Sequence, residues 1–202
     1  MKLYFSPGAC SLSPHIVLLE AGLPFTLEKV DLRSKTTASG ADFRTINPKG
    51  YVPALELDNG EVLTEGPAIV QYLADQAPDK QLAPPNGSTA RYQLMAWLNF
   101  IGTEVHKNYS PLFDPSSAIE IKNLAYANLT RRYAHINATL QTSDYLFGDQ
   151  FSVADAYLFV ITNWAGHVKL DLSDFPHVMA FQKRIGARPA VQQALRAEGL
   201  IK

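Results

Sequence analysis

The stretch that decides the fold is KLYFSPGACSLSP, which spans residues 2–14. Residues 2–5 form a short strand pattern, and the turn-forming residues 6–8 separate this strand from a helix with Pro14 in its first turn. Gly22 marks where the helix ends, because glycine readily takes the left-handed conformation found at helix C-termini. The chain therefore opens as an α/β domain, with a strand that leads directly into a helix.

Strand and helix signals continue to alternate through about residue 77. Residues 25–32 predict a second strand, whose apolar alternation changes phase once and indicates a bulge or a twist. A loop or short helix follows at residues 34–47. Asp58-Asn59-Gly60 then predicts a hairpin turn between two strands, since Asn and Gly accept positive φ at little cost. A helix with Pro67 in its first turn completes the pattern, so we expect a small mixed sheet with helices on its faces.

A cluster of prolines at residues 78–86 marks a boundary between two domains. We expect an α/β domain at residues 1–77, a linker at 78–86 and an all-helical domain at 87–202. Helices are predicted over residues 88–107, 117–140, 152–168, 175–185 and 189–198. In the second of these, apolar side chains at steps of three and four predict one buried stripe of Ile121, Ala125, Leu129, Tyr133, Ile136 and Leu140.

The overall composition excludes several classes of protein. The formal net charge of -1 gives no field that would gather nucleic acid or an anionic membrane. No apolar run approaches the length of a membrane span, and no signal-peptide core follows Met1, so we expect a cytoplasmic protein without membrane contact. The single cysteine, Cys10, forms neither an internal disulfide nor a cysteine metal cluster, so redox chemistry needs an external thiol.

Four motifs along the chain resemble the bacterial beta-class glutathione transferases. They are KLYFSPGACS at residues 2–11, NPKGYVPAL at 47–55, LTEGPAI at 63–69 and FSVADAY at 151–157. The resemblance implies an N-terminal thioredoxin-like domain and an all-α C-terminal domain, joined in a homodimer. It also implies glutathione as co-substrate, no metal, and transfer of glutathione to small hydrophobic electrophiles in the detoxification of xenobiotics. One departure is Gly66, where the family usually carries Ser or Thr.

Cys10 is the first candidate for the chemistry. An isolated cysteine is more often a buried structural thiol. Its place after a Pro-Gly turn and before a helix instead favours a reactive cysteine, because the helix dipole and the free amide groups there stabilise a thiolate. The spacing from Cys10 to Ser13 also imitates the redox motif Cys-x-x-Cys, with the second cysteine replaced by serine.

The resemblance assigns most of the glutathione site in the first domain. Val52 and Pro53 would form a cis peptide bond, so that the Val52 N–H and C=O pair with the cysteinyl unit of glutathione as an added strand. Glu65 would hold the γ-glutamyl ammonium while the Gly66 N–H faces a carboxylate, although Glu65 alone reads as a simple capping acid. Lys35 would hold the glycyl carboxylate. Without the resemblance, Lys35 is interpreted as an ordinary surface lysine.

The first helix of the second domain carries a polar stripe. Helical spacing places Asn99, Thr103 and His106 on one face, beside Lys107, and a solvated face is the simpler interpretation. The resemblance instead assigns Asn99, Thr103, Glu104, His106 and Lys107 to the glutathione site, with Glu104 reaching the glutathione of the partner subunit. His106 would position or polarise the glutathione sulfur.

Two further positions are interpreted as structural. Ser152 and Asp155 form the spacing of an N-terminal capping box before a strongly apolar helix, so Asp155 is not expected to be a catalytic acid. Tyr4 lies within the first strand and is expected in the core or the site wall, although some transferases use an N-terminal tyrosine.

Three functions stay open at this point. In conjugation, Cys10 would donate a hydrogen bond to the glutathione thiolate, because a second thiolate alongside would repel it. In a thiol transferase or a reductive dehalogenase, Cys10 would itself be the nucleophile. A non-catalytic ligand-binding or dimerisation protein is the third. Phe113 and Trp164 are candidates for the apolar electrophile pocket.

Overall fold

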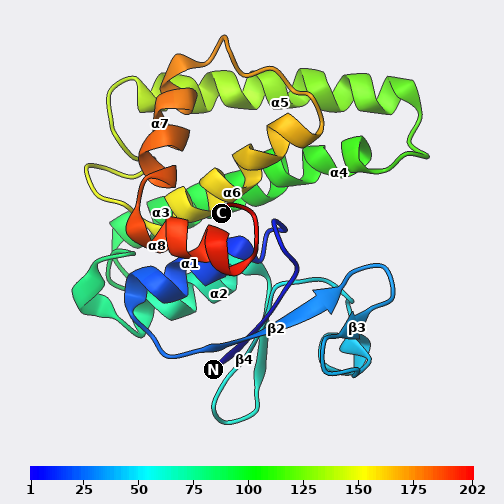
Figure 1. Ribbon diagram of the computed structural model, residues 1–202. Helices are drawn as coiled ribbons and strands as arrows, with labels where there is room; N and C mark the ends of the chain where they lie inside the picture. Colours follow the sequence, from blue (N-terminus) through cyan, green and yellow to red (C-terminus); the bar gives the residue numbers. More distant parts are fainter. The chain divides into compact units, whose positions relative to one another are not determined.

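The computed structural model describes residues 1–202, and its contacts divide the chain into two compact units (Figure 1). The first unit comprises residues 1–83 with 188–202, and the second comprises residues 84–187. The last helix therefore groups with the first unit, whereas a division by sequence order assigns it to the helical domain. None of the helices combines the length and the apolar character that crossing a membrane requires.

The first unit is built on a five-stranded mixed sheet of order β3-β2-β1-β4-β5, as in thioredoxin-like domains. Its strands are β1 (Lys2–Phe5), β2 (Thr26–Asp31), β3 (Thr36–Thr37), β4 (Ala54–Glu56) and β5 (Val62–Thr64). β1 pairs parallel with β2, and the other pairs are antiparallel. The register between β1 and β2 runs unbroken from Thr26 to Lys29, so the strand contains no bulge there. β3 was not predicted, because two residues show no periodicity.

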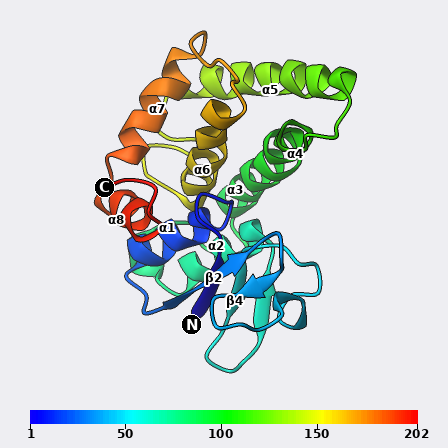
Figure 2. The same cartoon turned by 45° about the vertical axis from the view of Figure 1, so that its right-hand side comes forward.

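Three helices and two short 3₁₀ turns accompany this sheet. They are α1 (Leu12–Ala21), η1 (Phe43–Thr45), α2 (Gly66–Asp75), η2 (Pro78–Lys80) and α8 (Pro189–Ala197). The predicted C-terminal cap of α1 is confirmed, since Gly22 adopts φ 67°. α1 packs against both α2 and α8, and Figures 1 and 2 show α1 and α2 on the same side of the sheet. This packing fixes the beginnings of α1 and α2 beside the sheet.

The second unit is entirely helical, as predicted. Its elements are α3 (Thr89–Phe100), η3 (Ile101–His106), α4 (Lys107–Phe113), α5 (Ile119–Leu140), α6 (Val153–His167) and α7 (Pro176–Gly186). α6 is buried along most of its length, as expected from its strongly apolar sequence. The predicted end near residue 107 is wrong, because η3 is a π-helical segment that continues into α4. Wide helical turns of this kind often occur at functional sites.

The buried stripe of α5 is confirmed for five of its six predicted residues. Ala125, Leu129, Tyr133, Ile136 and Leu140 are all buried. Ile121, however, is 51% exposed, and its neighbours Ile119 and Leu124 are also exposed. The buried stripe of α5 thus begins only at Ala125.

Candidate active site

The loop that carries Cys10 is held against the start of α1 by a serine. The Ser6 N–H donates to Ser11 Oγ at 3.1 Å, and the Ser11 hydroxyl donates back to the Ser6 carbonyl at 3.2 Å. Ser11 is fully buried and is also the N-cap of α1. Cys10 therefore lies half-buried at the end of a fixed loop, just before the helix.

The Cys10 thiol acts as a hydrogen-bond donor. Its Sγ lies 3.3 Å from the carbonyl oxygen of Val52, and a carbonyl accepts a proton but has none to donate. The first amides of α1 are already used, since the Leu12 and Ser13 N–H groups donate to the carbonyls of Ala9 and Cys10. The thiolate expected at this helix start therefore stays a prediction.

A buried carboxylate just after the last helix also holds this loop. Glu198 Oε2 accepts the Gly8 N–H at 2.9 Å, and Glu198 Oε1 lies 2.9 Å from His15 Nδ1 in α1. The side chains of His15 and Glu198 are 1% and 0% exposed. Leu200 also lies beside the loop, since a Cβ added at Gly8 would meet its side chain at 3.4 Å. Sequence reasoning missed this contact: Glu198 reads locally as an ordinary polar residue at a helix end.

Val52 and Pro53 lie directly beside Cys10. Their peptide bond is cis, and both residues are buried. The preceding loop is fixed by the buried Asn47, whose side-chain amide donates to the Tyr51 carbonyl at 2.7 Å. None of the protein's hydrogen bonds uses the Val52 N–H. The backbone of Val52 therefore offers its N–H as a free donor. Its carbonyl also has a second lone pair beyond the one that faces Cys10.

Glu65 and Gly66 form the start of α2. Glu65 adopts φ 70°, which is costly for a residue other than glycine and is characteristic of functional sites. Its carbonyl accepts the N–H groups of Ala68 and Ile69, and its exposed carboxylate pairs with Lys49 at 2.5 Å. A Cβ on Gly66 would lie at an ordinary 3.8 Å from Pro53, so a side chain fits there.

Lys35 is also held in an unusual backbone conformation. Its φ is 60°, and Lys35 and Glu65 are two of the four non-glycine residues with positive φ. The Lys35 ammonium donates to the Gly50 carbonyl at 2.9 Å, which places it against the loop that precedes Val52. The structure thus brings Lys35 to this loop, while a role toward a carboxylate stays a prediction.

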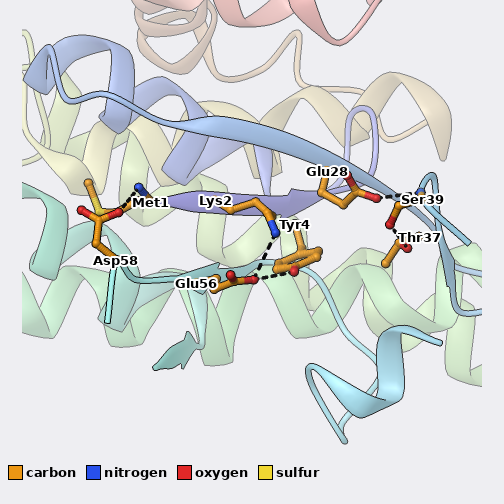
Figure 3. A network of polar contacts seen from close by, with 8 residues as sticks. All are labelled: Met1, Lys2, Tyr4, Glu28, Thr37, Ser39, Glu56 and Asp58. Carbon is orange, nitrogen blue, oxygen red and sulfur yellow. Dashed lines mark hydrogen bonds and ion pairs between the residues drawn. The ribbon is translucent and has the colours of Figure 1, made fainter. Parts of the chain in front are cut away.

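Tyr4 is part of the core, as expected from its place in β1. Its ring packs against Phe43 at 5.6 Å, and its hydroxyl donates to Glu56 at 2.6 Å in the polar network of Figure 3. Burial, followed by the contact with the Glu56 carboxylate, raises the pKa of Tyr4 well above its usual value. A tyrosine that activates a thiol needs a free hydroxyl of ordinary or lowered pKa, so Tyr4 is unsuited to that task.

The second unit places His106 in an aromatic cluster. His106 Nδ1 lies 2.7 Å from the Tyr157 hydroxyl, and the imidazole meets the Trp164 ring edge-to-face at 4.9 Å. Phe113 contacts Trp164 at 5.5 Å and remains 48% exposed. Phe113 and Trp164, both predicted for an apolar pocket, are therefore neighbours in one partly exposed aromatic surface.

The other predicted residues of this unit lie along the end of α3 and η3. The Thr103 hydroxyl donates to the Asn99 carbonyl at 3.0 Å, and both side chains are exposed, as is Lys107. The Glu104 carboxylate accepts two hydrogen bonds from Arg132 of α5, at 2.9 and 2.6 Å. Contacts of these four residues with a ligand stay predictions.

Ser152 and Asp155 form the predicted capping box at the start of α6. One Asp155 oxygen accepts the Ser152 N–H at 2.8 Å and the Ser152 hydroxyl at 2.7 Å, and the other accepts the Leu146 N–H at 2.8 Å. Burial raises the pKa of Asp155 to about 6 against the opposing effect of these hydrogen bonds. The predicted capping box is therefore confirmed, while the absence of a catalytic role for this carboxylate stays a prediction.

Known proteins match this chain along its whole length. Family models match residues 8–76 as a glutathione S-transferase N-terminal domain and residues 104–189 as the C-terminal domain. Glutathione S-transferase GstA of Escherichia coli O157:H7 is 50% identical over 99% of this chain and 100% of its own. The structure of BphK, a bacterial GST in a ternary complex, is 61% identical with a TM-score of 0.98, covering 98% of this chain and 100% of its own.

Two further structures come from sphingomonads, and each match covers 100% of both chains. The first, 48% identical with a TM-score of 0.96, is a glutathione S-transferase complexed with glutathione. The second, from Sphingomonas chungbukensis, is a bacterial beta-class enzyme, 49% identical with a TM-score of 0.97.

Proposed function

Because this chain belongs to the glutathione S-transferase family and is of the bacterial beta-class type, we propose that it conjugates glutathione to small hydrophobic electrophiles, with Cys10 beside the glutathione sulfur. The observation that carries this proposal is the unused Val52 N–H next to the Cys10 thiol. An extended peptide can pair with such an edge through main-chain hydrogen bonds, and glutathione is a short extended peptide.

The ends of glutathione find complementary groups in the first unit. The Glu65 carboxylate receives the γ-glutamyl ammonium, and the Gly66 N–H at the start of α2 receives the adjacent carboxylate. Lys35, which already reaches the Gly50 carbonyl, supplies a cation for the glycyl carboxylate. The bound cysteinyl unit then lies along Val52, with its sulfur directed to the Cys10 side.

The chemistry follows from the proton on Cys10. When the glutathione thiolate arrives, the Cys10 thiol can turn from the Val52 carbonyl and donate to that sulfur, because a charged acceptor forms the stronger hydrogen bond. The glutathione sulfur attacks the electrophilic carbon, a carbon–sulfur bond forms, and the leaving group departs with its electron pair. Cys10 keeps its proton throughout and forms no covalent bond.

The aromatic surface of the second unit supports an apolar co-substrate. Phe113 is half-exposed and Trp164 is partly exposed, so their rings can receive a flat or apolar electrophile. His106, whose ring contacts Trp164, adds one polar group to this surface. Such a combination of apolar walls with few polar groups is typical of small-molecule sites.

Glutathione binding and turnover test the proposal together. Isothermal titration should show glutathione binding, and reduced glutathione with chlorodinitrobenzene should give the conjugate at a rate above the uncatalysed reaction. A protein that binds glutathione but gives no conjugate would be a carrier. Mixed-disulfide substrates turned over in place of chlorodinitrobenzene would reassign the chain as a thiol transferase.

We further propose that the enzyme is a cytoplasmic homodimer that acts in detoxification. The single thiol suits a reducing compartment, where it stays reduced. In the dimer, Glu104 would reach the glutathione of the partner subunit, with Arg132 orienting its carboxylate. Light scattering at micromolar concentration should therefore give twice the mass of one chain, and a fully active monomer would overturn this part of the proposal.

A further inference from the structure

Lys49 and Glu65 form an ion pair at the proposed glutathione site. The Lys49 ammonium lies 2.5 Å from Glu65 Oε1 and 3.2 Å from the Thr64 hydroxyl. The two side chains are 49% and 65% exposed, so a ligand from solvent can reach the pair. The carboxylate in this pair is the one that the proposed function gives to the γ-glutamyl ammonium.

We propose that Lys49 determines glutathione affinity by occupying Glu65 in the free enzyme and competing with the γ-glutamyl ammonium of the incoming peptide. The inference rests on the proposed function. The Lys49 side chain ends in a primary ammonium, which is the same charged group that glutathione presents. Glutathione therefore gains its contact with Glu65 only as the Lys49 contact is weakened or lost.

The geometry makes Lys49 the partner that moves. The backbone of Glu65 is fixed, because its carbonyl accepts two amides of the first turn of α2 and its φ is 70°. Lys49 reaches Glu65 through a flexible four-carbon side chain, whose ammonium lies among exposed groups. The ammonium can leave for water at the cost of one exposed ion pair, while Glu65 stays in place.

The sign of the effect separates this proposal from simple charge attraction. Glutathione carries two carboxylates and one ammonium, so loss of a nearby lysine should weaken binding if Lys49 acts only through net charge. Competition predicts the opposite. Lys49→Gln should lower the dissociation constant of glutathione about two- to fivefold, the range that an exposed ion pair supports.

Lys80 offers a matched control for the change in charge. Its side chain is 48% exposed and lies 3.9 Å from Asp79, so Lys80→Gln also removes one cation from an exposed pair in the same unit. Isothermal titration should give the same glutathione affinity for Lys80→Gln as for the wild type. Lys49→Gln alone should bind more tightly.

A glutathione analogue that lacks the γ-glutamyl amino group completes the experiment. This analogue has no ammonium to place on Glu65, so Lys49→Gln should not bind it more tightly than the wild type does. Unchanged or weaker glutathione binding by Lys49→Gln, or equal tightening for the analogue, would overturn the inference. A wild type that binds no glutathione would instead overturn the proposed function itself.

Discussion

Replacement of Asp155 tests how the buried capping box stabilises the fold. In Asp155→Ala, the backbone N–H groups of Leu146 and Ser152 lose their acceptor, and so does the Ser152 hydroxyl. The hydroxyl can rotate to another acceptor, but the two buried amides cannot, and each costs about 1–3 kcal/mol. We expect a loss of about 2–4 kcal/mol of unfolding free energy at pH 8, because removal of a buried charge offsets part of the total.

The size of this loss should depend on pH. Burial raises the pKa of Asp155 to about 6, above the value of about 3.9 in an unfolded chain. A raised pKa in the folded state gives stability that is complete below the unfolded pKa and is lost as pH rises through the folded pKa. The difference between wild type and Asp155→Ala should therefore be larger at pH 5 than at pH 8, by about 1–1.5 kcal/mol.

Urea unfolding of both proteins at pH 5 and pH 8 gives the measurement. Asp114→Ala is a suitable control, because exposed Asp114 also caps a turn but has a lowered pKa, so its effect should not change between these two pH values. A wild-type advantage that grows with pH would refute the reasoning, because the hydrogen bonds would then outweigh burial. Turnover per folded molecule should be unchanged in Asp155→Ala.

Two other positions give predictions, one on the KM for glutathione and one on stability. Gly66→Ser adds a hydroxyl at the start of α2 where space exists, so the KM for glutathione should fall about two- to tenfold, while Gly66→Ala should leave it unchanged in steady-state assays. Glu198→Ala leaves the Gly8 N–H and the His15 ring without their buried partner, so thermal or urea melts should show a loss of about 2–4 kcal/mol. Glu120→Ala on the exposed start of α5 should change stability little, and an equal loss there would contradict the role given to Glu198.

The parts of the fold that follow local rules could be predicted from the sequence. The turn at residues 58–60, the helix end at Gly22 and the capping box of Ser152 with Asp155 each depend on neighbours a few residues away. Their partners lie within one turn of the chain, so residue type and spacing determine them. The order of strands and helices followed for the same reason.

The remainder depends on contacts between distant residues. Glu198 lies 183 residues from His15 and 190 from Gly8, and no periodicity connects them. The hydrogen bond from the Cys10 thiol to the carbonyl of Val52 joins residues 42 apart, whereas helix position alone indicated a thiolate. For the same reason, the sequence could not show that Lys49 reaches Glu65.

The role of Cys10 as a hydrogen-bond donor is the central claim, and Cys10→Ala tests it most directly. A hydrogen bond to a charged acceptor contributes about 1.5–3 kcal/mol, so the kcat/KM for conjugation of glutathione to chlorodinitrobenzene should fall roughly 10- to 150-fold. Cys10→Ser, which keeps a donor, should lie closer to the wild type. Both variants should retain conjugation, whereas Cys10→Ala should form no mixed disulfide with oxidised glutathione. A loss of conjugation near a thousandfold, or about 4 kcal/mol, would contradict it, because one donor cannot supply that much.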